Sequence, residues 1–234
     1  MSEDLEIHTY LTISPNEYGI YIFDQKNSKN LYKNTFKIEQ INNSVDSNIL
    51  NEFLEKNIFQ IEKLIGKFIE NIFVVLENNK ILRVDFSIKK KNYGDLISQQ
   101  IIENALVDAK DLFKESYNDS KIIHMIVENY LVDNDQYSLF DKNLNGTNFC
   151  LEVKFLYVSN NLSLNIEKVL EKYHIKVTQY FDGNYVKSLF KNDKIEISEM
   201  TFRVQNGFNE NEIKLIPKNP KKKGFFEKFF QLFS

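Results

Sequence analysis

The sequence has few of the residues that build the most familiar functional sites. Its 234 residues include one cysteine, seven glycines and three prolines. The single cysteine, Cys150, excludes an internal disulfide and a zinc site built from cysteines, and it fits a reducing compartment. Glycine-rich phosphate loops are absent, since neither G-x-x-x-x-G-K-[ST] nor G-x-G-x-x-G occurs. We therefore expect no enzyme activity and no bound cofactor.

Long hydrophobic runs and a strong net charge are also absent. No stretch approaches the roughly 20 apolar residues of a membrane-spanning helix. The acidic start, Met1–Glu6, is unlike the basic start of a signal peptide. A net charge of −3 argues against a general nucleic-acid binder, and 42% hydrophobic with 27% charged residues is typical of a globular protein. These features predict a folded protein on the cytoplasmic side of the membrane.

Metal-binding patterns are missing from the sequence as well. The histidines at positions 8, 124 and 174 fall in separate segments without ligand spacing. His124 alternates with core positions, which predicts a residue on a sheet face. The acidic segment Asp133–Gln136 lacks the glycine and the distal glutamate of a calcium-binding loop, so we expect a hairpin turn there. No metal site is predicted.

The first third of the chain changes from a strand pattern to a helix pattern. Alternation of apolar and polar residues predicts strands at 5–13, 18–23 and 31–38, with a turn at Ser14–Glu17. Asp46 or Ser47 then caps a helix whose apolar positions run from Ile49 to Phe68.

The rest of the chain predicts a mixture of strands and helices. Asp95 is expected to cap a helix that reaches Phe113, and a second helix is expected at 162–173. The predicted strands lie at 72–76, 81–88, 122–131, 149–158, 175–177, 193–204 and 212–216. The fold class expected is therefore α+β.

The C-terminal segment 217–234 has the strongest physical pattern in the sequence. Residues 218–234 contain five lysines and one glutamate, which gives them a net charge of +4 in a chain whose net charge is −3. At about 100° per residue, its phenylalanines and leucine fall within an arc of roughly 160°. A basic linker followed by a short amphipathic helix is typical of an interfacial membrane anchor. A helix docked on its own domain is the alternative, and nucleic-acid binding is disfavoured because no aromatic residues alternate with the lysines.

This pattern assigns ten residues to binding of anionic lipids. They are Lys221, Lys222, Lys223, Phe225, Phe226, Lys228, Phe229, Phe230, Leu232 and Phe233.

Three motifs in the middle of the chain resemble one bacterial family. Lys121–Asn134, Phe140–Val153 and Asn165–Val177 are similar, in order and spacing, to segments of the SHS2 subdomain of FtsA. FtsA proteins are actin homologues that tether the division ring to the membrane. The resemblance covers about residues 81–178, and it implies an SHS2-like subdomain inserted in an actin-like one.

The ends of the chain agree with the FtsA family in part. The order hairpin, helix, strand over residues 5–77 resembles the actin-like subdomain 1A, and Lys221–Phe233 resembles the membrane-targeting helix of the family. The first phosphate loop of the family corresponds to Leu11–Glu17, which lacks its aspartate and glycine. The second phosphate loop and the second lobe are missing. ATP binding is therefore not expected.

Together these features predict four parts: 1–80, actin-like; 81–190, SHS2-like; 191–216, C-terminal strands; and 217–234, the linker and amphipathic helix. The function expected is a non-catalytic adaptor at the cytoplasmic face of the bacterial inner membrane, at the division site. Its partners would be anionic lipids, FtsZ or later division proteins, and a second copy that contacts the hairpin 133–146. The alternatives are a pilus assembly platform like PilM, or a small-molecule-binding SHS2 module.

Overall fold

The protein is described from a computed structural model, which covers residues 6–38, 45–77, 80–141, 143–191 and 193–214. It has two sheets and five helices in these residues, which confirms the α+β class. The chain forms two compact units. Unit 1 consists of Met1–Leu82 and Tyr157–Phe208, and unit 2 consists of Arg83–Leu156 and Asn209–Ser234.

Unit 1 is built on a five-stranded sheet in the order β3-β2-β1-β4-β9. Its strands are β1 (Ile7–Ile13), β2 (Glu17–Asp24), β3 (Lys29–Lys37), β4 (Asn71–Leu76) and β9 (Lys176–Asp182). β1, β2 and β3 form an antiparallel meander, whereas β4 is parallel to both β1 and β9. The order hairpin, helix, strand predicted from the sequence is confirmed.

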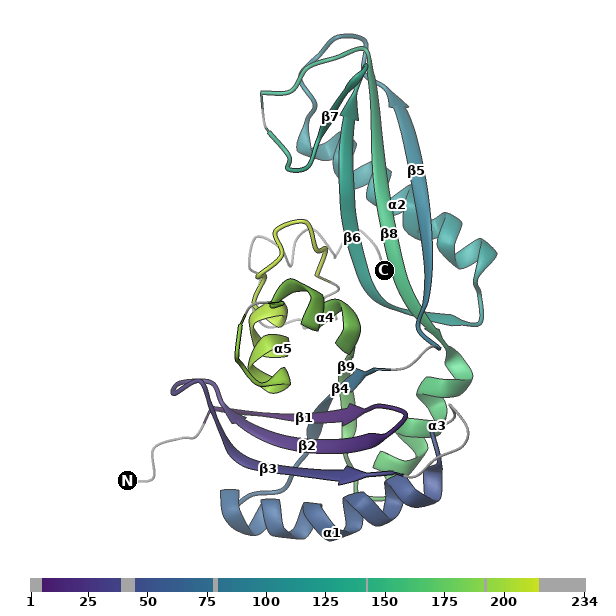
Figure 1. The fold of residues 1–234 in the computed structure, drawn as a ribbon. Helices are drawn as coiled ribbons and strands as arrows, with labels where there is room; N and C mark the ends of the chain where they lie inside the picture. Colours follow the sequence, from purple (N-terminus) through teal and green to yellow (C-terminus); the bar gives the residue numbers. More distant parts are fainter. Residues whose placement is uncertain (1–5, 39–44, 78–79, 142, 192, 215–234) are drawn as a thin grey trace. The chain divides into compact units, whose positions relative to one another are not determined.

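Helices cover both faces of this sheet (Figure 1). On one face, α1 (Ser47–Ile65) packs through Leu50, Phe53 and Leu54, and α3 (Asn160–Glu171) lies beside it. On the other face lie α4 (Gly183–Leu189) and α5 (Ile197–Gln205). The core on this second face is rich in aromatic residues. It contains Tyr10, Tyr21, Phe23, Phe73, Val75, Phe181, Val186, Phe190, Ile197 and Val204.

The predicted cap of α1 is confirmed, but the helix is shorter than expected. The Asp46 carboxylate accepts bonds from the N–H groups of Asn48 and Ile49, which would otherwise have no partner in the first turn. Gly66 adopts a left-handed conformation with φ of 70° and ends the helix. Phe68, expected on the apolar face, consequently lies beyond the helix and is 81% exposed, and Leu64 in the last turn of the helix is 55% exposed.

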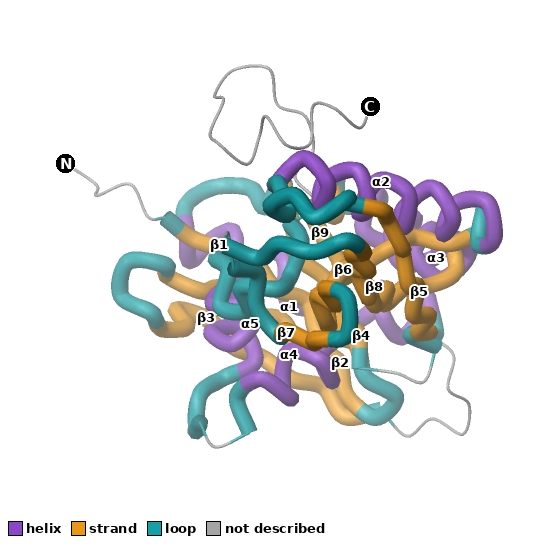
Figure 2. The backbone as a smooth tube through the Cα atoms, turned by 90° about the horizontal axis from the view of Figure 1, so that it is seen from above, coloured by secondary structure: helices purple, strands orange, loops and turns teal. Residues whose placement is uncertain are grey.

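Unit 2 is a four-stranded sheet in the order β5-β8-β6-β7, with one long helix along it (Figure 2). Its strands are β5 (Leu82–Lys91), β6 (Ser120–Val132), β7 (Asp135–Tyr137) and β8 (Asn148–Ser159), and the helix is α2 (Gln99–Ser116). The Ser98 hydroxyl, not Asp95, caps α2, because it accepts a bond from the Ile101 N–H.

The predicted strand at 193–204 is wrong, because most of this segment belongs to α5 (Ile197–Gln205). Its buried residues Ile197, Thr201 and Val204 recur every three or four positions, which is the period of a helix. α4 was not predicted at all. Of the strand expected at 212–216, Glu212 forms an isolated bridge with Ile126.

The boundaries of the two units also differ from the predicted parts. Residues 157–190 were expected in the SHS2-like part, but they belong to unit 1, because β9 pairs with β4 and α3 packs on α1. The predicted linker and helix at 217–234 lie outside the described residues.

Candidate functional site

A cleft of about 590 Å³ opens in unit 1, on the face of the sheet that carries α4 and α5. The turn between β1 and β2 contributes Ser14 and Glu17, and the residue after β4 contributes Glu77. The helical side contributes Lys187 and Met200. In the resemblance to FtsA, this turn corresponds to the first phosphate loop of that family. The N–H groups of the turn and the charges of the cleft therefore decide whether a phosphate could bind here.

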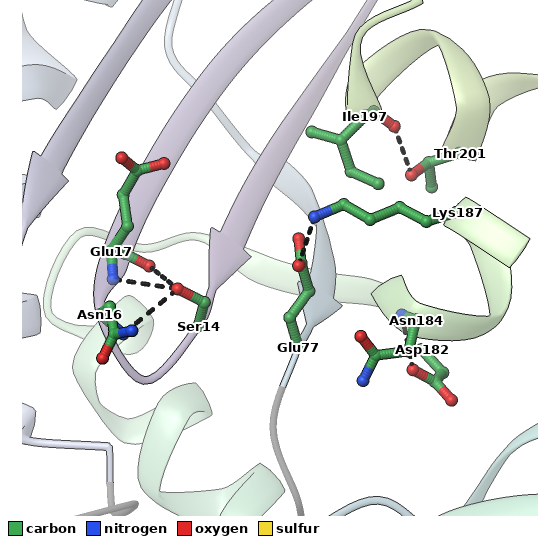
Figure 3. A network of polar contacts seen from close by, with 9 residues as sticks. All are labelled: Ser14, Asn16, Glu17, Glu77, Asp182, Asn184, Lys187, Ile197 and Thr201. Atoms are coloured by element: carbon green, nitrogen blue, oxygen red, sulfur yellow. Dashed lines mark hydrogen bonds and ion pairs between the residues drawn. The ribbon is translucent and has the colours of Figure 1, made fainter. Parts of the chain in front are cut away.

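The β1–β2 turn is closed by the Ser14 side chain (Figure 3). Ser14 Oγ accepts bonds from the N–H groups of Glu17, at 2.9 Å, and Asn16, at 3.4 Å. It also donates to the Glu17 carbonyl at 2.9 Å, and the Ser14 N–H donates to the same oxygen. A phosphate cradle needs several backbone N–H groups that point outward, whereas those of residues 14, 16 and 17 already have partners within the turn.

A second polar group joins the end of β4 to α4. Lys187 Nζ pairs with the Glu77 carboxylate, and Figure 3 shows the lysine reaching from its helix across to the strand end. Gly183 lies beside Glu77, and a Cβ at this position would overlap Glu77 Cγ. Asp182 caps α4 through the Asn184 N–H at 2.9 Å. The close approach that glycine permits is therefore what places α4 next to Glu77.

A third polar group joins β3 to α5. Lys33 Nζ lies 2.8 and 2.9 Å from the two oxygens of Glu196, and 5.9 Å from the centre of the Tyr21 ring. The bond to Glu196 raises the pKa of Lys33, and burial raises the pKa of Tyr21. Both lysines that line the cleft are thus paired with a carboxylate, and Glu17 adds a third acidic group.

This arrangement is unfavourable for a nucleotide triphosphate. A bound polyphosphate would face three carboxylates, and each lysine would have to leave its ion pair to reach it. No group of three or more histidine, cysteine or acidic residues in the described part of the chain could hold a metal ion. Ion pairs join the sheet to its helices across the cleft, and the cleft supplies little that would bind an anion.

The histidine, cysteine and aspartate that the sequence raised as possible ligands or nucleophiles make contacts that support the fold. His124 on β6 is buried, and its Nδ1 lies 2.6 Å from the Glu212 carboxylate. Cys150 on β8 is half-buried, and burial raises the pKa of its thiol, which makes it a poor nucleophile. Asp133 forms the predicted turn, and its carboxylate accepts bonds from the N–H groups of Thr147 and Asn148.

The ten predicted lipid-binding residues, from Lys221 to Phe233, lie outside the described residues. What the structure does describe is the segment that leads to them. The Ile213 N–H donates to the Met125 carbonyl at 2.8 Å, and the Val127 N–H donates to the Asn211 carbonyl at 2.9 Å. Residues 211–213 therefore run along β6 and fix the start of the C-terminal segment to unit 2. The sequence did not predict this pairing, because Ile213 and Met125 are 88 positions apart, and Asn211 and Val127 are 84 positions apart.

No protein-family model matches the sequence. Several solved structures share part of the fold. A PilM–PilN type IV pilus biogenesis complex aligns over 78% of this chain and 49% of that one, with 8% identity and a TM-score of 0.49. The cytoplasmic domain of EpsL, an inner-membrane component of the type II secretion system of Vibrio cholerae, aligns over 77% and 59%, with 10% identity and a TM-score of 0.40.

A protein of unknown function with an actin-like ATPase fold, from Bacteroides thetaiotaomicron, aligns over 82% of this chain and 60% of that one, at 10% identity and a TM-score of 0.34. The chain thus spans about half to three fifths of these three chains. Likenesses with TM-scores below 0.5 do not place the chain in a family.

One curated relative matches in sequence. It is a Plasmodium falciparum protein named as a histone-lysine N-methyltransferase, which is 27% identical over 188 residues. The match covers 76% of this chain and 2% of that protein. So small a share of a very long protein does not show a family.

Proposed function

We propose that the protein is a non-catalytic adaptor that binds the cytoplasmic face of the bacterial inner membrane through Lys221–Phe233 and acts in cell division. The observation that carries the proposal is the division of this segment into a lysine cluster and a one-sided arc of phenylalanines. None of the helices in the described part of the chain combines the length and apolar composition needed to cross a bilayer.

The two halves of the segment contribute by different forces. Each lysine near an anionic leaflet contributes about 1 kcal/mol, and this attraction weakens as the salt concentration rises. The phenyl groups contribute through burial of apolar area, which does not depend on salt in this way. The pairing of residues 211–213 with β6 supports the proposal, since it would couple a membrane-bound segment directly to a folded unit.

Co-sedimentation of the full chain with anionic vesicles tests the proposal. We expect Phe229→Glu to abolish binding at physiological salt, because it places a charge in the apolar arc. The triple variant Lys221→Gln, Lys222→Gln, Lys223→Gln should weaken binding by at most about 3 kcal/mol, and by less in high salt. Leu139→Glu is the matched control, because Leu139 is an exposed apolar residue of the folded part. Equal pelleting of wild type and Phe229→Glu would contradict membrane binding through this segment.

The expected absence of ATPase activity can be tested by measuring nucleotide binding. Because the β1–β2 turn uses its own N–H groups and both cleft lysines are paired, we expect no heat of binding when Mg·ATP is titrated to millimolar concentration. Micromolar affinity in calorimetry would contradict this expectation, and it would reopen an actin-like ATPase function.

Assignment to cell division rests on the three motifs that resemble FtsA, and a pilus assembly platform like PilM is the alternative. A two-hybrid assay separates them. Division predicts interaction with FtsZ or a later division protein and a fluorescent fusion at the septum. Interaction with pilus assembly proteins alone would favour the platform. A small molecule that copurifies with unit 2 would favour a ligand-binding SHS2 module.

A further inference from the structure

The outer face of α1 carries one large exposed apolar side chain, Phe59. The inner side of the helix is buried against the sheet, whereas Phe59 on its outer side is 72% exposed. Figure 1 shows α1 along the sheet face opposite to α4 and α5, and no described helix or strand of unit 1 lies on its outer side. Phe36 of β3 is 45% exposed at the flank of the helix, where Lys56 Nζ lies 6.0 Å from its ring centre.

Four residues form a narrow stripe at the centre of this face. At about 100° per residue, Glu52, Lys56, Phe59 and Lys63 fall within an arc of about 60°, and all four are exposed. The acidic residue lies near the N-terminal end of the stripe and the basic residue Lys63 lies at its C-terminal end.

The charges at the two ends of the stripe, Glu52 and Lys63, are complementary to each other when the helix is reversed, and Lys56 of each copy then faces Phe59 of the other. If a second α1 is laid antiparallel across a two-fold axis midway between Asn57 and Ile58, Glu52 of each copy faces Lys63 of the other. The two Phe59 side chains then lie within about one helical turn of each other near the axis. A two-fold interface requires a surface that matches its own inverted copy.

We propose that α1 is a homodimer contact in which two copies pack antiparallel, with Phe59 at the centre and Glu52–Lys63 ion pairs at both ends. A lipid surface is a poorer occupant, because the stripe and its neighbour Glu55 include both signs of charge and would gain little from anionic headgroups. The contact uses only described residues of unit 1, so it does not depend on membrane binding by Lys221–Phe233.

Sedimentation velocity of the full chain in lipid-free buffer, over a wide concentration range, tests the contact. We expect a concentration-dependent dimer. Phe59→Ser should raise the dissociation constant about a hundredfold or more, since it removes two central aromatic contacts per dimer. Leu164→Ser is the matched control, because Leu164 is 50% exposed on α3 and outside the stripe, and it should leave the constant unchanged.

Charge exchange tests the antiparallel register. Lys63→Glu alone should weaken the dimer about tenfold or more by placing like charges opposite each other, and Glu52→Lys alone should do the same. The double variant Glu52→Lys, Lys63→Glu restores opposite charges and should recover most of the wild-type affinity. Circular dichroism checks that each variant folds.

Three outcomes would overturn the proposal. One is a wild-type chain that stays monomeric at every concentration. Another is a double variant as weak as the single ones. The third is a dimer that Phe229→Glu abolishes while Phe59→Ser leaves it intact, which would place the contact in the C-terminal segment. Failure of the dimer leaves the vesicle assay of Phe229→Glu unaffected, so the two proposals are tested separately.

Discussion

Asp133 shows how one side chain can organise a loop of unit 2. Its backbone is left-handed, with φ of 53°, in the turn between β6 and β7. The carboxylate accepts bonds from the N–H groups of Thr147, at 3.1 Å, and Asn148, at 2.9 Å. These bonds to Asn148 and Thr147 lower the pKa of Asp133. The turn is thereby tied to the start of β8.

The lowered pKa of Asp133 predicts a pH-dependent contribution to stability. A carboxylate whose pKa is lower in the folded protein stabilises the fold above its unfolded value of about 3.9, and this contribution is lost as the pH falls through the folded value. Asp133→Asn tolerates the left-handed backbone but cannot ionise. We expect the wild type to be more stable than this variant at neutral pH and the difference to shrink below about pH 4.

Urea unfolding of the two proteins at a series of pH values measures this difference. Asn134→Ala serves as the control, because it changes a neighbouring turn residue that does not titrate. Its effect on stability should stay constant with pH. A difference between wild type and Asp133→Asn that is equally constant would contradict the role assigned to the carboxylate.

At the scale of elements, aromatic stacking holds α2 against the sheet of unit 2. Phe113 on α2 is 1% exposed, and its ring centre lies 5.1 Å from that of Phe155 on β8 at an interplanar angle of 28°. Phe86 of β5 meets Phe155 edge to face at 5.6 Å. These contacts join the helix to two neighbouring strands.

Truncation of Phe113 should therefore destabilise unit 2 strongly. We expect Phe113→Ala to cost about 3–5 kcal/mol, since it removes a buried ring and leaves a cavity. Leu112→Ala, at the adjacent position, is the control, because Leu112 is 42% exposed and its loss should cost less than about 1 kcal/mol. Urea unfolding, monitored by circular dichroism, measures the loss of unfolding free energy in each variant. Hydrogen exchange of the β8 amides measures the same loss within unit 2. Equal losses would contradict the packing described.

Local patterns predicted most elements, but one local period was misread, and one helix depends on a long-range contact. The strands of the first hairpin and the Asp46 cap were predictable, because period-two alternation and capping chemistry act between near neighbours. The segment at 193–204 was misread as a strand, although its buried residues have helical spacing. The short helix α4 begins at Gly183, where the absence of a side chain permits close contact with Glu77, and no local pattern reveals this contact.

The sequence predicted that the cleft lacks a phosphate loop, but it did not predict the ion pairs of the cleft. The loss of the phosphate-loop residues in Leu11–Glu17 could be seen directly. The pairing of Lys187 with Glu77, and of Lys33 with Glu196, joins residues 110 and 163 positions apart, so it required the fold. The lipid-binding prediction at Lys221–Phe233 stays a prediction.

At the scale of the whole molecule, the two proposals together predict bivalent membrane binding. A dimer formed through α1 would carry two copies of Lys221–Phe233. After the first segment binds, the second acts at a high effective concentration, so the dimer should bind vesicles more tightly than one segment alone.

Phe59→Ser should accordingly weaken vesicle binding by the full chain roughly ten- to hundredfold, although every lipid-binding residue is intact. Co-sedimentation over a range of lipid concentrations measures the effect, with Leu164→Ser as the control. A monomeric Phe59→Ser variant that binds vesicles as tightly as the wild type would show that the segments act singly.

The parallel pairing of β4 with β9 also has a consequence for synthesis of the chain. Ile72 pairs with Val177, 105 positions later. At roughly 5–20 residues per second, a ribosome needs about 5–20 s to make the intervening chain. During that time the edge of β4 that β9 will cover, with the apolar run Ile72–Leu76, has no partner strand, although β1 on its other side has already been made. Translation speed between these two strands, and the chaperones that bind near the exit tunnel, should therefore influence the yield of native protein more than the same conditions do after Asp182 has emerged.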